Sequence, residues 1–276
     1  MTILNKDWPV EFPFPTVIRT VVCSDLDETY IPSDSDKKKT EWDRSAGILY
    51  YIPCRKKGDS RWLDHRNKSG FSLAKIQGIY IAKPSLYMLQ SRHRILLGEK
   101  WSLIPSETWA ERISRSGYSR QNVNCLVKIL MEKEIPLLKQ PEDYQGPFKV
   151  SYYYPESPSI ASDFATIQEL ADERRIRVVF TRCNPAAGDP SGCYDVEFIP
   201  LCCGKDQAVS FLMEETGLPK EAIIAFGDSA NDFAMFAQAG SGYLVGNADP
   251  FAVSQYGNRL NSAYCHGILS VLKELQ

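Results

Sequence analysis

The sequence has little histidine and no closely paired cysteines, and both absences bear on metal chemistry. Its 276 residues include 3 histidines and 8 cysteines, and no two cysteines stand in a CxxC pair. Structural zinc sites are usually built from such pairs or from histidines. A zinc site is therefore not expected, and any bound metal would be held by oxygen ligands.

The chain also lacks a long apolar run, an apolar N-terminal segment and a large net charge. Lys6, Asp7, Pro9 and Glu11 stand where a secretory signal would be apolar. No apolar run approaches the length of about 20 residues that spans a bilayer. The 32 basic and 34 acidic residues give a net charge of -2, whereas nucleic-acid binders normally carry a basic excess. We expect a cytoplasmic protein with free thiols and with neither a membrane nor a nucleic acid as partner.

The charge that is present is unevenly distributed. Residues 55–100 hold 11 basic and 3 acidic side chains, a net of +8, whereas the rest of the chain holds 21 and 31, a net of -10. This window differs in character from the sequence on either side of it.

Both ends of the chain have the pattern of a parallel α/β sheet. Residues 17–23 and 222–226 are short apolar runs that predict buried strands, and an acidic loop follows each of them. Further elements are expected as helices at 205–216, 233–239 and 266–275, and as a strand at 242–245. Strands that alternate with helices favour a parallel sheet with crossovers.

The middle of the chain has a different order of expected helices and strands. Helices are expected at 119–132 and 160–174, and strands at 148–154, 177–183 and 194–199. The sequence therefore predicts an α/β fold, a doubly wound parallel-sheet core with an inserted α+β domain. The expected boundaries are 1–105 and 201–276 for the core and 106–200 for the insertion.

The acidic loops carry the chemistry. Asp25 and Asp27 follow the first strand, at the sheet edge where ligands of open parallel sheets bind. One carboxylate can attack phosphorus, and a second can act as general acid and then as base. Mg²⁺ prefers oxygen ligands and would be held by Asp25, Asp228 and the main-chain carbonyl of Asp27. Lys205, at a helix start, offers a cation for the phosphate. Each motif alone also has a purely structural explanation. The first could be a capped turn after a strand, residues 227–232 could be acidic residues in a first helical turn, and Lys205 could be a surface lysine. Their combination, in this order, favours catalysis.

This set of motifs resembles the haloacid dehalogenase superfamily of phosphatases. The resemblance implies that Asp25 is the nucleophile, Asp27 the acid and base, and Lys205 the group that screens the phosphoryl charge. Asp25, Asp27 and Asp228 would hold Mg²⁺. Four neighbours would support them: Thr29, Ser229, Asn231 and Asp232. The insertion resembles the C2-type cap of the sucrose-phosphatase-like branch.

A longer string narrows the resemblance. Residues 182–190 (RCNPAAGDP), 194–196 (YDV) and 198–200 (FIP), with 225–229 (AFGDS), are similar to the bacterial kanosamine-6-phosphate phosphatases. This implies a sugar phosphate as the partner, with kanosamine 6-phosphate as the specific expectation. Sucrose 6-phosphate or a related glycosyl phosphate is the close alternative.

The second motif of that superfamily is not found. It should be a strand that ends in Thr-Gly, whose hydroxyl binds the transferred phosphoryl group. Ser69-Gly70 is the nearest dipeptide, but the polar residues 64–68 before it do not fit a buried strand. One explanation is a divergent basic surface loop, although a long structureless loop is unusual in a compact domain.

A shifted reading frame is the second explanation. With suitable third bases, the codons of residues 64–76 read one base later give ITGTNLASALRK, and those of residues 84–95 give PHFICCSLGTEF, similar to a segment of the resembled family. The Thr-Gly pair would overlap the codons of His65, Arg66 and Asn67. The shift would begin near residues 50–57 and end near 100–102. It predicts that residues 55–100 are either irregular or poorly determined in the structure, and it raises the alternative that the chain is an inactive, non-enzymatic product.

The inserted domain would choose the substrate. Lys149, Ser151 and Tyr153 alternate onto one face of an expected strand, and polar and aromatic side chains suit a sugar. Further candidates near the linker are Arg182, Asn184 and Asp195. Each could instead be an ordinary strand or surface position, and Arg182 could pair with Asp189 or Asp195.

Overall fold

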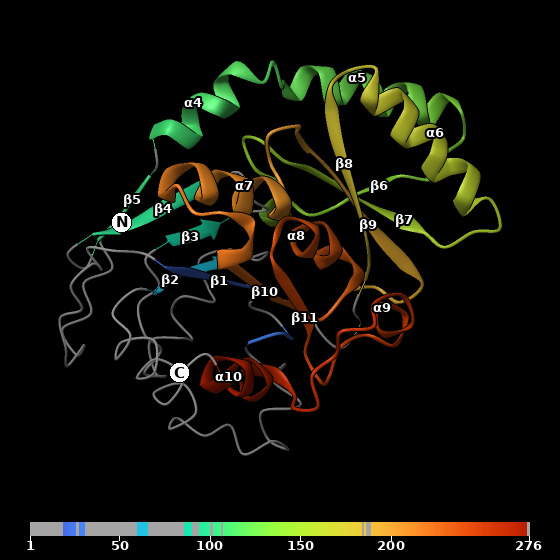
Figure 1. Ribbon diagram of the computed structural model, residues 1–276. Coiled ribbons are helices and arrows are strands. Elements are labelled where there is room, and N and C mark those ends of the chain that lie inside the picture. Colours follow the sequence, from blue (N-terminus) through green and yellow to red (C-terminus); the bar gives the residue numbers. More distant parts are fainter. Residues whose placement is uncertain are drawn as a thin grey trace. The chain divides into compact units, whose positions relative to one another are not determined.

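The chain divides into two compact units in the computed structural model (Figure 1). The structure describes residues 19–25, 28–30, 107–183, 185 and 189–274 in full, and four strands between residues 60 and 105 by their backbone. Residues 1–106 and 205–276 form the core unit, and residues 107–204 form the inserted unit. No helix in the described part of the chain is both long and apolar enough to cross a membrane.

The core unit is built on a seven-stranded sheet of order β11-β10-β1-β2-β3-β4-β5. β11, β10, β1, β2 and β3 run parallel, whereas β4 pairs antiparallel with both β3 and β5. The strands are β1 (Thr20–Asp25), β2 (Ser60–His65), β3 (Leu86–Leu89), β4 (Arg94–Glu99), β5 (Ser102–Pro105), β10 (Ile223–Gly227) and β11 (Ser241–Leu244).

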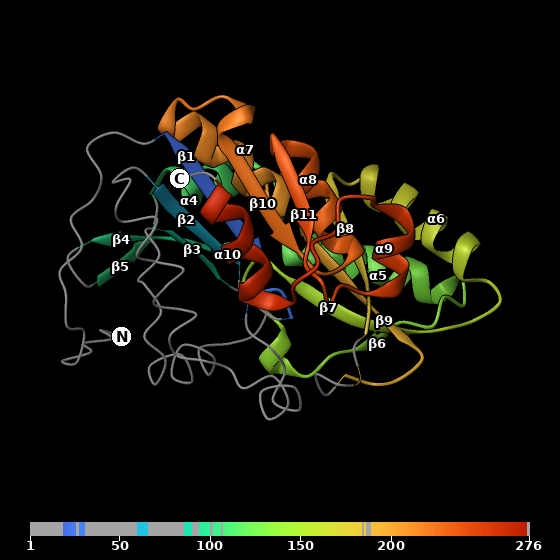
Figure 2. The ribbon, with the colours of Figure 1, turned by 60° about the horizontal axis from the view of Figure 1, so that its bottom comes forward.

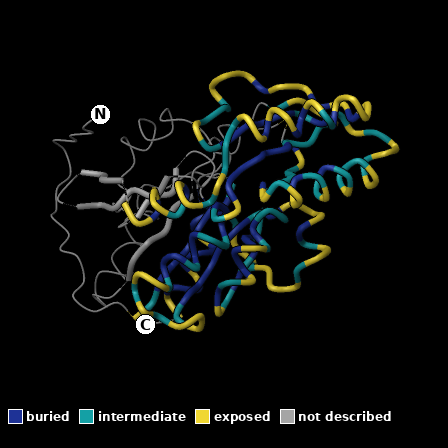
Figure 3. The backbone as a smooth tube through the Cα atoms, turned by 90° about the horizontal axis from the view of Figure 1, so that it is seen from above, coloured by how far each residue is buried: buried dark blue, intermediate teal, exposed yellow. Residues whose placement is uncertain are grey.

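Helices cover both faces of the central strands. α10 (Tyr264–Glu274) packs Ile268 and Leu272 into a cluster with Val22, Ile224 and Phe226 of β1 and β10, and it lies across β10 in Figure 2. The other helices are α7 (Lys205–Thr216), α8 (Phe233–Gln238) and α9 (Pro250–Gln255), with short 3-10 turns at Lys220–Ala222 and Ala230–Asp232. α7 and α8 lie on the side opposite α10 (Figure 1). Strands covered on both faces are largely apolar, which explains the continuous apolar runs. β1 and β10 are buried along nearly their whole length, and Figure 3 shows buried backbone through the centre of the described chain.

The inserted unit is a four-stranded antiparallel sheet with helices. The strand order is β6 (Leu138–Lys139), β7 (Val150–Pro155), β9 (Cys193–Pro200) and β8 (Ile176–Arg182). Its helices are α4 (Glu107–Arg115), α5 (Arg120–Glu132) and α6 (Ile160–Asp172), with a 3-10 turn at Glu142–Tyr144. The Ser119 side chain caps α5 by accepting the backbone N–H of Asn122 at 3.1 Å.

Alternation along the strands gives this sheet one apolar face. Val150, Tyr152 and Tyr154 of β7 join Val196 and Phe198 of β9 in a cluster with buried residues of α5 and α6. Successive strand residues point to opposite faces, so the residues between them form the other face, which is polar.

The structure bears on the expectation for residues 55–100 in two ways: most of the window lies outside the described residues, and the rest of it forms strands. β2, β3 and β4 lie inside this window, so it is not irregular throughout. Asp64 and His65, judged unfit for a buried strand, end β2, and His65 pairs in parallel register with Asp25. Strand pairing uses backbone groups, so polar side chains do not prevent it. Ser69-Gly70 lies outside the described residues.

Candidate active site

Two acidic loops meet at the carboxyl edge of the core sheet. Asp25 is the last residue of β1, and Asp228 follows the last residue of β10. The two strands are parallel neighbours, with Ser24 opposite Phe226. Asp25, Asp228 and Asp232 each place a carboxylate oxygen within 4.8 Å of the others. The predicted acids Asp25 and Asp228 are therefore brought together, and Asp232 joins them.

Lys205 is the cation of this cluster. It is the first residue of α7 and is 3% exposed. Its Nζ lies 3.1 Å from Asp25 Oδ2, donates to Asn231 Oδ1 at 2.8 Å, and also pairs with Asp232. A buried ammonium is tolerated only when it is paired and hydrogen-bonded. These contacts fix the position of the amine beside the Asp25 carboxylate.

Asp232 shapes the loop that carries Asp228. Its Oδ2 accepts the backbone N–H groups of Asp228 at 3.1 Å and Ser229 at 3.2 Å. The Thr29 hydroxyl donates to Asp228 Oδ1 at 2.9 Å and so joins the loop after β1 to the loop after β10. Hydrogen bonds to the protein therefore orient both acids.

Gly227 leaves the space that Asp232 occupies. A Cβ on residue 227 would lie 2.3 Å from Asp232 Cγ, closer than real Cβ contacts. We expect Gly227→Ala to displace the Asp232 carboxylate and to lower the free energy of unfolding by about 1–3 kcal/mol. Urea unfolding would measure this, with Gly257→Ala, at an open position, as the matched control. Equal stability of the two variants would contradict the packing described here.

The acids disfavour one another's ionisation. The pKa of Asp228 is raised well above its ordinary value, mainly by burial and then by the charges of Asp232 and Asp25, although Lys205 and Thr29 oppose the shift. Burial also raises the pKa of Asp232, and Lys205 lowers it in opposition. Within the described part of this cluster, three carboxyl groups lie beside the Lys205 ammonium group and repel one another.

A divalent cation fits this donor set. Carboxylate oxygens are the ligands that hard cations prefer, and a second positive charge would balance the acids. The residues that could hold it are Asp25, Asp228 and Asp232. Asp27, predicted as a catalytic residue and a metal ligand, lies outside the described residues.

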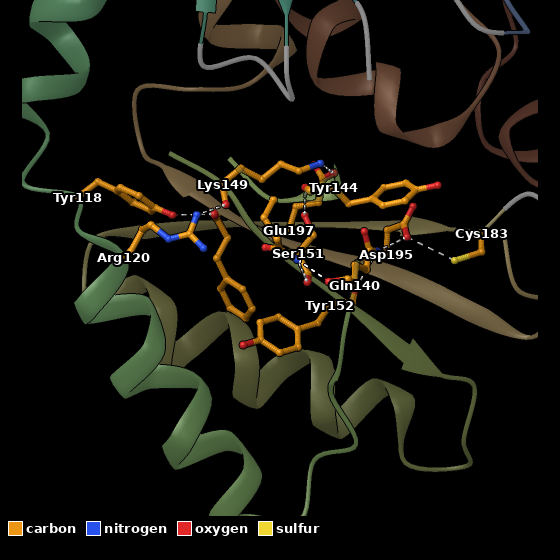
Figure 4. Close-up of polar contacts among 12 residues, drawn as sticks. Tyr118, Arg120, Gln140, Tyr144, Lys149, Ser151, Tyr152, Cys183, Asp195 and Glu197 are labelled. Carbon is orange, nitrogen blue, oxygen red and sulfur yellow. Dashed lines mark hydrogen bonds and ion pairs between the residues drawn. The ribbon is translucent and has the colours of Figure 1, made fainter. Parts of the chain in front are cut away.

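The polar face of the inserted unit holds a second group of buried polar side chains (Figure 4). Lys149 Nζ and Glu197 Oε1 form a buried ion pair at 2.7 Å. Ser151, 0% exposed, pairs in register with Glu197, and Gln145 Oε1 accepts its N–H at 2.9 Å. The predicted Lys149 and Ser151 thus lie on one face, but both are bonded within the protein.

Asp195 lies on the same face without an ion pair among the described residues. Its Oδ1 accepts Gln140 Nε2 at 2.7 Å and the Cys183 thiol at 3.5 Å. Burial, followed by the charges of Glu197 and Asp189, raises the pKa of Asp195 to about 6. Among the described residues, this carboxylate therefore has hydrogen-bond donors but no cationic partner.

The remaining predicted substrate contacts in this unit are Tyr153, Arg182 and Asn184. Tyr153 is opposite Asp195 in the β7–β9 register, and burial is the main cause that raises its pKa to about 12. Arg182 makes an exposed pair with Glu156 at 3.5 Å, so its alternative pairing with Asp189 or Asp195 is wrong. Asn184 lies outside the described residues.

Sequence reasoning missed Glu197 and Gln140. Glu197 stands two residues after Asp195 in β9, so the period of two was a usable signal for a shared face. Gln140 precedes the short turn before β7, and no local pattern singles it out.

A family model and known proteins match this chain. The model described as sucrose-6F-phosphate phosphohydrolase matches residues 72–270. Kanosamine-6-phosphate phosphatase of Bacillus subtilis (strain 168) is 39% identical over 170 residues, which are 60% of this chain and 60% of that protein. An uncharacterized hydrolase of Staphylococcus aureus is 27% identical over 175 residues, 62% of this chain and 65% of that protein. The chain thus spans less than two thirds of the length of these curated relatives.

Solved structures match nearly the whole chain. A haloacid dehalogenase-like hydrolase from Bacillus subtilis is 30% identical, with a TM-score of 0.69 over 95% of this chain and 94% of that one. The sucrose-phosphatase from Synechocystis sp. PCC6803, solved with sucrose and phosphate, is 20% identical, with a TM-score of 0.70 over 94% and 98%. At that identity the second match speaks for the fold alone. The predicted fold class is confirmed, and the chain belongs to the sucrose-6F-phosphate phosphohydrolase family of haloacid dehalogenase-like proteins.

Proposed function

We propose that this protein is a Mg²⁺-dependent phosphatase that hydrolyses a sugar phosphate through an aspartyl-phosphate at Asp25. The observation that carries the proposal is the buried Lys205 amine, 3.1 Å from the Asp25 carboxylate and beside two further acids. Such a lysine can stabilise charge on a transferred phosphoryl group, and the metal can do so from the acidic side. The family and its phosphatase relatives support the same reaction.

The residues divide the reaction into two steps. An Asp25 oxygen attacks phosphorus, the bond from phosphorus to the sugar oxygen breaks, and Asp27 donates its proton to that oxygen. Asp27 then takes a proton from water, whose oxygen attacks phosphorus and releases Asp25 and inorganic phosphate. Bound Mg²⁺, held by Asp25, Asp228 and the Asp27 carbonyl, would supply positive charge against the phosphate. The Lys205 amine, which donates a hydrogen bond to Asn231, would supply a further positive charge to the phosphate.

Metal affinity should fall as the pH is lowered. The raised pKa of Asp228 means that a proton competes with the metal above the ordinary carboxyl value of 3.8. We expect the Mg²⁺-induced rise in Tm to shrink from pH 8 to pH 5, with up to about a tenfold weaker Kd per pH unit below the Asp228 pKa. A pH-independent Mg²⁺ shift would contradict this proton competition. Asp228→Asn is the control and should lose most of the shift at every pH.

We propose that the polar face of the inserted unit binds the sugar. Kanosamine 6-phosphate is the specific substrate, because its ammonium group would supply a cation to Asp195, which has none among the residues that the structure describes. Lys149, Ser151, Tyr153, Arg182 and Asn184 remain proposed contacts.

Replacing Asp195 with asparagine should therefore reduce substrate discrimination. Losing a charged hydrogen bond costs about 1.5–3 kcal/mol, which is roughly a 10- to 100-fold rise in KM for kanosamine 6-phosphate. Glucose 6-phosphate, which has a hydroxyl in place of the amine, is the matched comparison, and its KM should change little. An equal change in KM for both substrates would contradict a contact between Asp195 and the ammonium group.

There are two alternatives. In the first, the same reaction acts on a different sugar, sucrose 6-phosphate or another glycosyl phosphate. Phosphate release from a panel of sugar phosphates would distinguish these substrates. An inactive product of a shifted reading frame would release none from any of them.

A further inference from the structure

Four described residues other than glycine adopt backbone conformations that favour glycine, and two of them, Glu28 and Tyr264, lie in the core unit and contact each other. Glu28, in the loop after β1, has φ 61°, and Tyr264, at the start of α10, has φ 52°. The left-handed region is disfavoured for residues with a Cβ, so it persists only where other contacts hold it. Here the contacts can be identified.

One amide side chain joins these two positions. Asn247 Nδ2 donates to the Glu28 carbonyl oxygen at 2.6 Å, and Asn247 Oδ1 accepts the Tyr264 N–H at 2.9 Å. If the amide were flipped, its oxygen would face the Glu28 carbonyl oxygen and its NH₂ group would face the Tyr264 N–H. Neither pair can form a hydrogen bond, so the amide has only one favourable orientation. The Tyr264 hydroxyl also lies 3.5 Å from Glu28 Oε2.

The loop that carries Asn247 holds both catalytic loops. Two residues further on, the Asp249 N–H donates to the Asp228 carbonyl oxygen at 2.8 Å. Glu28, held by Asn247, is followed by Thr29, whose hydroxyl bonds to Asp228 Oδ1. The loop after β11 therefore fixes the turn after β1 and the turn after β10 from one side.

We propose that Asn247 is a positioning residue that holds the catalytic loop after β1 in its left-handed turn. This inference rests on the proposed phosphatase function for its kinetic consequences, but the turn itself can be measured without activity. Without the amide, Glu28 would relax to a negative φ, and Thr29 would move away from Asp228.

The first test compares Asn247→Ala with Asn258→Ala. Asn258 makes a similar bond, from its Nδ2 to the Gly242 carbonyl oxygen at 2.7 Å, within the same unit and away from the acids. Asn247→Ala should lower kcat about 10- to 100-fold, as small misplacements of reacting groups do, whereas Asn258→Ala should leave kcat within about threefold of the parent. Similar kcat values for the two variants would overturn the proposal.

The second test uses glycine at position 28. Glycine adopts the left-handed conformation without steric cost, so the turn should depend less on the amide in a Glu28→Gly background. The double variant Glu28→Gly/Asn247→Ala should therefore recover kcat to within about fivefold of Glu28→Gly alone, a non-additive result. Additive losses would mean that Asn247 does not act through the Glu28 backbone.

Hydrogen exchange separates this inference from the function. The amide hydrogens of a peptide covering residues 25–30 should exchange faster in Asn247→Ala than in the parent chain. In Asn258→Ala their exchange rate should be unchanged. If the parent chain releases no phosphate but this difference is found, the phosphatase proposal fails and the positioning role stands. Equal exchange in both variants would overturn the positioning role, whatever the activity.

Discussion

Replacing Asp25 with asparagine should abolish Mg²⁺-dependent phosphate release from sugar phosphates. The amide of asparagine has the shape of the carboxyl group but is a poor nucleophile, so the first step loses its attacking atom. Removal of a covalent nucleophile typically costs about 10⁴-fold or more in kcat. Phosphate release at saturating kanosamine 6-phosphate would measure the loss.

The fold should survive this change. Lys205 keeps its contacts with Asn231 and Asp232 when Asp25 becomes neutral, so the Tm should stay close to that of the parent chain. Glu111→Gln, which alters an exposed pair with Arg115 in the inserted unit, serves as a control with full activity. Equal phosphate release by the parent and Asp25→Asn would contradict the nucleophile assignment.

Restoring the shifted frame over residues 55–100 should raise activity strongly. We propose that this window was translated in the wrong frame, so that the chain lacks the Thr-Gly hydroxyl of its family. The register of β2 places His65 opposite Asp25, where a residue at the strand end would reach the same sheet edge. Removing one oxyanion-type donor costs about 10²–10³-fold in kcat, so a gene with one base removed near codons 50–57 and one added near codons 100–102 should encode a correspondingly faster enzyme.

The stability of the restored chain gives a second readout. A buried strand with an apolar sequence should raise the free energy of unfolding by several kcal/mol, a large part of the about 5–15 kcal/mol of a typical domain. The same window shifted in the opposite direction is the control and should show neither gain. Independent sequencing of the gene would contradict the hypothesis if repeated reads support an uninterrupted frame without compensating indels.

The parts of the site that were predictable lie in local patterns. The strands that end at Asp25 and before Asp228 could be read from short apolar runs, because both faces of these strands are covered by helices. The contact between Lys205 and Asp25 follows from the parallel crossover topology together with the motif order. Its distances, and the burial of Asp232 under two backbone N–H groups, depend on the folded loops and are not encoded in any spacing.

Other features depend on partners far away in the sequence. β2 was missed because its pairing with β1 relies on backbone groups, while most of its side chains, those of Ser60, Arg61, Asp64 and His65, are polar. Asn247 was missed because its partner is the carbonyl oxygen of Glu28, which no side-chain pattern marks. In the inserted unit, Lys149 and Ser151 followed from the strand period, whereas the Lys149–Glu197 pair required the β7–β9 register.

Trapping the covalent intermediate tests the account most directly. The parent chain is incubated with Mg²⁺ and kanosamine 6-phosphate, quenched with borohydride, which reduces an acyl phosphate to an alcohol, and digested for mass spectrometry. We predict reduction at residue 25 alone, dependent on substrate and Mg²⁺. Phosphate release with residue 25 unmodified, or reduction at a different acid, would contradict nucleophilic catalysis by Asp25.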